Sequence, residues 1–253
     1  MLRLLNITFS CNDPERLAEF WGTLLDYEAA SAGDSWIATD PRGEGTRLLF
    51  NRMEKSGTIE VPIHVDVNVP DREAELNRIL QLGGRFVETR SDSIGDFSET
   101  WTVMRDPEGN GFCIQSPPKT PPHRYIGNVT FSCAEPRQLG AFWAEALGWP
   151  EEETDEGFLQ QLRDAGVAER DLSGVYVTRP PNAGRPRFLF QRREKSRPAS
   201  YPIHMDFGTD DREAEVTRLV RAGASVVETK EGAGANLTFT ILRDPEENPF
   251  CVG

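Results

Sequence analysis

Apolar residues near the start of the chain follow first the period of a strand and then the period of a helix. Residues 4–10, LLNITFS, alternate as a strand does, and Asp13-Pro14 then supplies a helix N-cap followed by proline in the first turn. The next apolar residues recur every three or four positions, as on one buried helix face: Leu17, Phe20, Trp21, Leu24 and Leu25. Strand-like runs at 35–39 and 46–52 complete a β-α-β-β pattern.

The same pattern starts again at residue 62. A strand at 62–69, PIHVDVNV, precedes a helix at 71–82 that the pair Gly83-Gly84 stops. Three strands follow at 85–89, 100–105 and 111–115, and the turn sequence DPEGN at 106–110 separates the last two. We therefore expect two β-α-β-β-type units before residue 117.

The second half of the chain repeats the first. NITFSCNDPERLAEFW at 6–21 returns as NVTFSCAEPRQLGAFW at 128–143, an offset of 122. PIH at 62–64 and DREAE at 71–75 return with an offset of 140, so 140 − 122 = 18 residues are inserted between Trp149 and Phe190. We predict an α+β protein with domains at 1–117 and 125–253 and a proline-rich linker at 118–124. A short amphipathic helix is expected in the insertion, near 150–186.

The overall charge excludes some classes of partner. The 253 residues carry 28 Lys and Arg against 41 Asp and Glu, a net charge of −13, and such a field repels nucleic-acid phosphates. No apolar run approaches the roughly 20 residues that cross a bilayer, so we expect no membrane partner. The first residues turn polar too early for a secretory signal, and no cysteine sits in a C-x-x-C pair. We therefore predict a cytoplasmic protein with reduced thiols.

Four segments carry a resemblance to a known family: TFSCNDPERLAEFW, IHVDV, DREAELNRILQLGG and WTVMRDPEGNGFC. Together they resemble the glyoxalase/bleomycin-resistance, or vicinal oxygen chelate, superfamily, in its glyoxalase-like domain branch and in two tandem copies. The resemblance implies that each copy contains two βαβββ units. These units would curl into a half-open, barrel-like cup that holds a metal or a small ligand.

The resemblance also implies four metal-ligand positions in each copy. In the first copy they fall on Asn6, on Phe50 or Asn51, on His64 and on Cys113; in the second, on Asn128, on Phe190 or Gln191, on His204 and on Cys251. One good ligand survives in each copy and both carboxylates are missing, whereas a stable divalent site needs three or four. We expect no metal and no other cofactor. The alternative combines His64 and Cys113 with a nearby carboxylate such as Asp66.

A His-Asp pair recurs at the matched strand of each copy. His64 and Asp66 are two residues apart and therefore share a strand face, as do His204 and Asp206. If that face lines the cup, each pair suits hydrogen bonding or proton transfer; otherwise it only satisfies buried polar groups. Trp101, whose counterpart is Phe239, is a candidate for stacking a planar ligand.

These observations predict a function class without naming a ligand. We expect metal-independent binding of a small hydrophobic or aromatic molecule, with sequestration or resistance as one use, by a monomer with paired domains or a homodimer. His64, Asp66, Trp101, His204 and Asp206 are the predicted ligand-binding residues, and no catalytic residue is assigned. The alternative is a lyase, isomerase or oxygenase-like enzyme of secondary or xenobiotic metabolism that uses the cup histidines or a degenerate metal site. A third hypothesis is a domain pair with a structural or interaction role.

Overall fold

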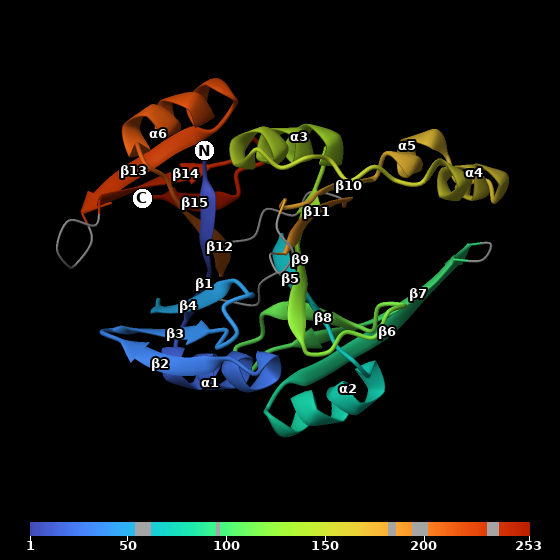
Figure 1. The fold of residues 1–253 in the computed structure, drawn as a ribbon, viewed down its shortest axis with the longest axis horizontal. Helices are drawn as coiled ribbons and strands as arrows, with labels where there is room; N and C mark the ends of the chain where they lie inside the picture. Colours follow the sequence, from blue (N-terminus) through green and yellow to red (C-terminus); the bar gives the residue numbers. More distant parts are fainter. Residues whose placement is uncertain (54–61, 95–96, 182–185, 194–201, 232–237) are drawn as a thin grey trace.

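The computed structural model describes all residues except 54–61, 95–96, 182–185, 194–201 and 232–237. Figure 1 shows the elements in chain order. The first repeat contains β1 (Arg3–Cys11), α1 (Pro14–Leu25), β2 (Glu28–Ala32), β3 (Ser35–Thr39), β4 (Arg47–Arg52), β5 (Ile63–Asn68), α2 (Arg72–Gln81), β6 (Arg85–Ile94), β7 (Phe97–Arg105) and β8 (Gly111–Gln115).

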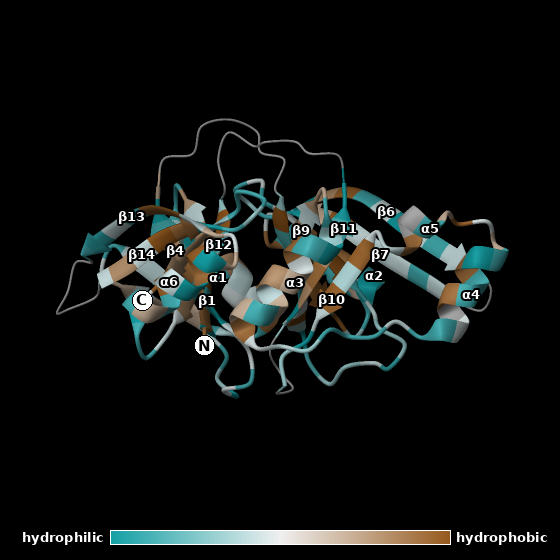
Figure 2. Cartoon of the chain, turned by 90° about the horizontal axis from the view of Figure 1, so that it is seen from above, coloured by the Kyte–Doolittle hydropathy of each residue, from teal (hydrophilic) through white to brown (hydrophobic). Residues whose placement is uncertain are grey.

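The second repeat has the same order with one change. It contains β9 (Tyr125–Cys133), α3 (Pro136–Leu147), α4 (Glu156–Asp164), α5 (Glu169–Leu172), β10 (Val175–Thr178), β11 (Arg187–Arg192), β12 (Ile203–Gly208), α6 (Arg212–Arg221), β13 (Ser225–Glu231), β14 (Thr238–Arg243) and β15 (Pro249–Val252). Helices α4 and α5 stand where the first repeat has β2, so the insertion is helical as expected. In two views they lie at the end of the molecule where β6 and β7 also end (Figure 1 and Figure 2).

Local sequence explains where the long helices begin and end. Asp13 caps α1 by accepting a hydrogen bond from the Arg16 backbone N–H at 3.2 Å, and Asp71 caps α2 in the same way. Helix α1 ends at Asp26 in the left-handed region (φ 58°). Each of these helices buries one face against its sheet. None of the described helices is long and apolar enough to cross a membrane.

The strands form two sheets, and each sheet combines strands of both repeats. The eight-stranded sheet has the order β13-β14-β15-β12-β1-β4-β3-β2, and the seven-stranded sheet has the order β10-β11-β9-β5-β8-β7-β6. The junctions are antiparallel pairs: Thr8 on β1 lies opposite His204 on β12, and Thr130 on β9 lies opposite His64 on β5. Each sheet is curved (Figure 1). We name its concave face by its histidine: the His64 cup in the seven-stranded sheet and the His204 cup in the eight-stranded sheet.

The α+β class and the tandem order of four β-α-β-β-type units are confirmed, and the described strands form no closed barrel. One part of the expectation was different: we expected both units of one repeat to build one cup. Instead, the first unit of each repeat joins the second unit of the other repeat through β1–β12 and β5–β9. Each cup therefore needs residues from both halves of the chain.

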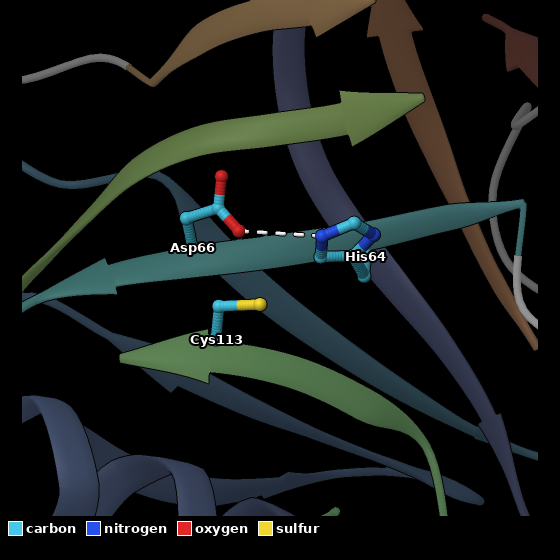
Figure 3. A group of neighbouring side chains, drawn as sticks. All are labelled: His64, Asp66 and Cys113. Atoms are coloured by element: carbon cyan, nitrogen blue, oxygen red, sulfur yellow. Dashed lines mark ion pairs between the residues drawn. The ribbon is translucent and has the colours of Figure 1, made fainter. Parts of the chain in front are cut away.

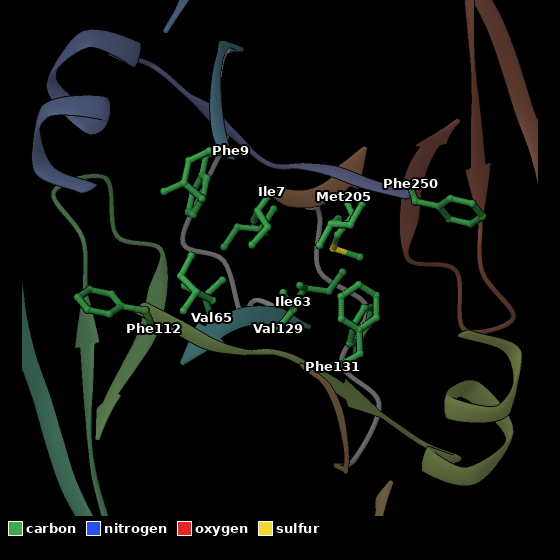
Figure 4. Packing of buried hydrophobic residues seen from close by; sticks show 14 of the residues in the cluster. Ile7, Phe9, Ile63, Val65, Phe112, Val129, Phe131, Met205 and Phe250 are labelled. Carbon is green, nitrogen blue, oxygen red and sulfur yellow. The ribbon is translucent and has the colours of Figure 1, made fainter. Parts of the chain in front are cut away.

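The two sheets pack against each other through their apolar faces. Ile7 and Phe9 on β1 meet Val65 on β5 and Val129 on β9, and all four side chains are fully buried (Figure 4). The opposite residues of the same strands face the cups, because side chains alternate along a strand. Helices α1, α2, α3 and α6 cover the outer apolar surfaces, α1 against β2–β4 and α3 against β10 and β11.

The repeated RDPE motif fastens the two units of one repeat to each other. Asp106 accepts hydrogen bonds from the Trp21 indole at 3.3 Å and from the Asn110 side chain at 2.6 Å. Glu108 accepts bonds from the backbone N–H groups of Asn12 and Asp13, just before α1. Because Trp21 and Asp106 belong to units in different sheets, the motif ties the sheets together. Asp244 and Glu246 do the same in the second repeat.

Candidate functional site

Three chemically reactive side chains meet on the concave face of the seven-stranded sheet. His64 and Asp66 project from β5 to the same side, and the Nε2 atom of His64 lies 3.3 Å from Oδ1 of Asp66 (Figure 3). Cys113 on β8 is the register partner of Asp66. One potential ligand atom from each residue lies within 4.8 Å of the other two. The floor of the His64 cup is therefore an imidazole, a carboxylate and a thiol.

The second repeat completes this floor. Oδ2 of Asp66 accepts hydrogen bonds from the Thr130 hydroxyl at 2.7 Å and from the Asn128 amide at 2.9 Å. The Asn128 carbonyl oxygen in turn accepts a bond from Nε of Arg187 at 2.9 Å. A continuous polar chain thus runs from the guanidinium through an amide and a carboxylate to His64.

The His204 cup repeats the arrangement with the contributions of the repeats exchanged. Asp206 lies 3.4 Å from the His204 ring and accepts bonds from Thr8 at 2.6 Å and Asn6 at 3.0 Å. Nε of Arg47 donates to the Asn6 carbonyl oxygen at 2.6 Å. Cys251 occupies the place of Cys113, so both cups carry the same six polar residue types.

Burial and hydrogen bonding set the protonation of the floor. Burial would raise the pKa of Asp66, but bonds from His64, Thr130 and Asn128 together hold that pKa below its usual value. The same balance lowers the pKa of Asp206. Burial, followed by the charge of Asp66, raises the pKa of the Cys113 thiol well above its usual range, and the Cys251 pKa rises to about 12. Each floor therefore combines an ionised carboxylate with a neutral thiol.

Apolar side chains form part of each cup wall, beside charged residues such as Arg90 and Glu88. Thr102 on β7 bonds to Arg72 of α2 on the convex side, so its neighbours Trp101 and Val103 face the His64 cup. Both side chains are half-buried, as is Leu189 on the opposite wall. Phe239, Ile241 and Leu49 hold the matching positions in the His204 cup.

The structure places every predicted ligand-binding residue on a cup face. His64, Asp66 and Trp101 lie in one cup, and His204 and Asp206 lie in the other. Of the other aligned positions, Phe50 and Phe190 are fully buried in the core and cannot reach a cup.

Sequence reasoning missed the arginines. Arg47 and Arg187 are separated by the same offset of 140 as the histidines, which is a signal that the repeat itself contains. Asn6 and Asn128 were considered only as weak metal ligands, whereas their amides connect each arginine to the carboxylate.

The floor fits a hydrogen-bonded network better than a divalent ion. The resemblance implies four ligands, yet the cup-facing residues of β9 and β11, among them Thr130, Leu189 and Gln191, supply no imidazole, thiolate or carboxylate. Asp66 already accepts bonds from Thr130 and Asn128 through Oδ2. Three donors therefore cluster, and no fourth imidazole, thiol or carboxylate of the described residues joins them within 4.8 Å.

We accordingly expect the purified protein to contain no stoichiometric divalent metal. Elemental analysis of protein prepared without chelator should find zinc, iron, nickel and manganese well below one equivalent per cup. One full equivalent of any of these metals per cup would contradict the expectation and would favour the His64, Asp66 and Cys113 set as ligands.

Comparison with known proteins supports one family. A family model described as "Glyoxalase-like domain" matches residues 6–115 and again 128–253. Glyoxalase I from Zea mays has a similar structure, with a TM-score of 0.69 at 12% identity, covering 100% of this chain and 92% of that one. A putative dioxygenase from Bacillus subtilis has a TM-score of 0.63 at 12% identity, covering 98% and 84%. No curated protein sequence matches the chain significantly.

Proposed function

Because the chain belongs to the glyoxalase-like domain family, we propose that it is a small-molecule-binding protein whose two cups hold their ligands without a metal. The observation that carries the proposal is the oriented His-Asp pair at the floor of each cup. A mostly apolar concavity with a few fixed polar groups is the usual form of a ligand site.

The Asp-His contact fixes how each imidazole meets a ligand. Asp66 faces Nε2 of His64, and no described group bonds Nδ1 of the same ring. The Asp66 carboxylate holds the ring in place and favours a proton on Nε2. The Nδ1 atom of the neutral ring can then accept a directed hydrogen bond from a ligand. Trp101 supplies a large flat wall in the same cup, which suits an aromatic ligand body.

This chemistry suits sequestration of a hydrophobic or aromatic compound in the cytoplasm. The four cysteines are unbridged in the structure, which fits the expected reducing compartment. One chain supplies both halves of both cups, so a monomer suffices for binding.

A second candidate function is catalysis by the same imidazole. An imidazole held by a carboxylate and facing an open site is the arrangement that general acid–base chemistry requires. A lyase or isomerase of secondary or xenobiotic metabolism could use His64 in this way, and an oxygenase-like enzyme would need the metal that we do not expect. Binding at equilibrium without turnover favours the first function, and product formation that His64→Ala abolishes favours the second.

The binding proposal is tested with a neutral aromatic probe. We expect 1-naphthamide to bind saturably in chelator-treated buffer, as measured by titration calorimetry. His64→Ala and His204→Ala should each weaken binding at their own cup by about 1–3 kcal/mol, because one buried hydrogen bond is lost.

His123→Ala is the matched control, since the third histidine lies outside both cups and pairs with Glu44 at 3.6 Å. Circular dichroism verifies that each variant is folded. If the two single variants and the double variant all bind the probe as the parent does, the site is elsewhere and the proposal fails.

A further inference from the structure

The two cups differ in the charge that surrounds their arginines. In the His64 cup, Nη1 of Arg187 forms an ion pair with Glu152 at 3.0 Å, and Glu152 also pairs with Arg179 at 2.7 Å. Hydrogen bonding from Arg179 and the charge of Arg187 hold the pKa of Glu152 below its usual value, so this carboxylate is ionised. The positive charge of Arg187 is therefore neutralised within the protein.

Strand register identifies the matching position in the other cup. Glu151 pairs with Thr178 in the second repeat, and Ala29 pairs with Ala38 in the first. Thr178 and Ala38 each lie opposite the residue that follows the cup arginine. Glu152, which follows Glu151, is consequently equivalent to Ala30, and the alanine carries no charge.

A second acidic side chain is also confined to the His64 cup. Burial and then the charge of Asp66 raise the pKa of Glu99 on β7, whereas Arg187 lowers it, so these three groups influence one another within this cup. Register makes Glu99 equivalent to Leu237, which lies outside the described residues and is apolar by sequence. Among the described residues, Ala30 thus replaces Glu152, whereas Glu28, whose counterpart is Pro150, shares the strand face of Ala30 without forming an ion pair with Arg47.

Arg47 in the His204 cup is positioned but not neutralised. Its Nε atom is fixed by Asn6, which in turn donates to Asp206. No described acidic side chain forms an ion pair with Arg47, and no described group bonds its two Nη atoms. Lys230 pairs with Glu228 at the His204 cup and Arg90 pairs with Glu88 at the His64 cup. Arg193, whose charge opposes the rise in the pKa of Cys113, has the uncharged counterpart Met53.

We propose that the His204 cup, and not the His64 cup, recognises an organic anion, whose oxyanion group meets the free Nη edge of Arg47 while its apolar body contacts Leu49 and Phe239. This inference rests on the proposed binding function and names the ligand class of one of its two sites. A guanidinium held in place by its own Nε bond presents two parallel donors to a carboxylate or phosphate. In the His64 cup, Glu152 bonds Nη1 of Arg187 and neutralises its charge, which disfavours an anion there.

The test compares two probes of equal shape, 1-naphthoate and 1-naphthamide, by titration calorimetry at low salt. We expect the parent to bind one equivalent of naphthoate more tightly than naphthamide. Arg47→Met should weaken naphthoate binding at least about tenfold and weaken naphthamide binding much less, since the charge-assisted bond is lost only to the anion. Arg47→Lys should restore part of the affinity.

Two variants of the other cup are the matched controls. Arg187→Met should leave naphthoate binding unchanged, and Glu152→Gln should create a second naphthoate site by freeing Arg187. Equal affinity of the two probes, or no saturable naphthoate binding by the parent, would overturn the inference about charge. The proposed binding function would then still be tested by the naphthamide titration. If Arg47→Met and His204→Ala both leave naphthoate binding unchanged, the probe binds outside the cup, and this result counts against the proposed function as well.

Discussion

Trp143→Ala is expected to lower the free energy of unfolding by about 4 kcal/mol, because a fully buried indole is removed from the centre of one repeat. Its ring packs against Phe207 and Phe250, with centroids 5.3 and 5.0 Å away. Its Nε1 atom donates to Asp244 at 3.1 Å, so truncation also withdraws a donor from a fully buried carboxyl group. The measurement is urea denaturation followed by far-ultraviolet circular dichroism.

Trp143→Phe separates the two contributions. It retains most of the ring volume and loses the indole N–H, so we expect a smaller loss of about 1–2 kcal/mol. The Trp21 variants in the first repeat should behave alike, because Trp21 donates to Asp106 in the same way. A Trp143→Ala protein as stable as the parent would show that the hydrogen bonds of the RDPE motif do not stabilise the packing of the two sheets.

Asp66→Ala is expected to lower the free energy of unfolding by about 3 kcal/mol at neutral pH and to abolish probe binding in the His64 cup. Removal of the carboxylate leaves the donors on Thr130, Asn128 and His64 without their acceptor. The Asp206→Ala loss should be smaller, because the Asp206 side chain is 19% exposed and that of Asp66 is 9% exposed.

The pH dependence of the Asp66→Ala effect has a definite sign. The pKa of Asp66 is lowered in the folded state from the value of 3.8 expected in the unfolded chain. Its stabilising contribution is therefore complete above that value and is lost as the pH falls through the folded pKa. The difference in stability between parent and variant should shrink below about pH 4. A difference that stays constant down to pH 2 would show that the loss comes from packing and not from the ionised carboxylate.

Much of the local structure could be predicted from the sequence. The N-caps at Asp13 and Asp71 and the helical stripe around Trp21 are local signals, and the helices begin and end near the expected residues. Strand β2 was missed, because Glu28–Ala32 has neither an apolar alternation nor β-branched residues. The His-Asp pairs were found because alternation along one strand places both side chains on one face.

The partners of those pairs could not be predicted, because they come from strands distant in the sequence. Thr130 and Asn128 reach Asp66 only through the β5–β9 pairing, and Glu152 reaches Arg187 only through the path of the insertion. No periodicity in one segment reports such a contact, since hydrogen bonds between strands join residues without regard to their separation along the chain. The charge difference between the cups is therefore a property of the tertiary structure.

The sequence by itself determined the repeat, the order of the units and the polar residues that each unit carries. It did not determine which units share a sheet. β1 and β9 have nearly the same sequence, NITFSC and NVTFSC, so either could pair with β5 or with β12 by pattern alone. The folded chain pairs β5 with β9 and β1 with β12, which leaves the apolar faces of all four strands to meet in one core between the sheets. The tertiary structure decided this choice. Only in the folded chain do the apolar faces of both repeats pack together while the hydrogen bonds of both RDPE motifs connect the two sheets.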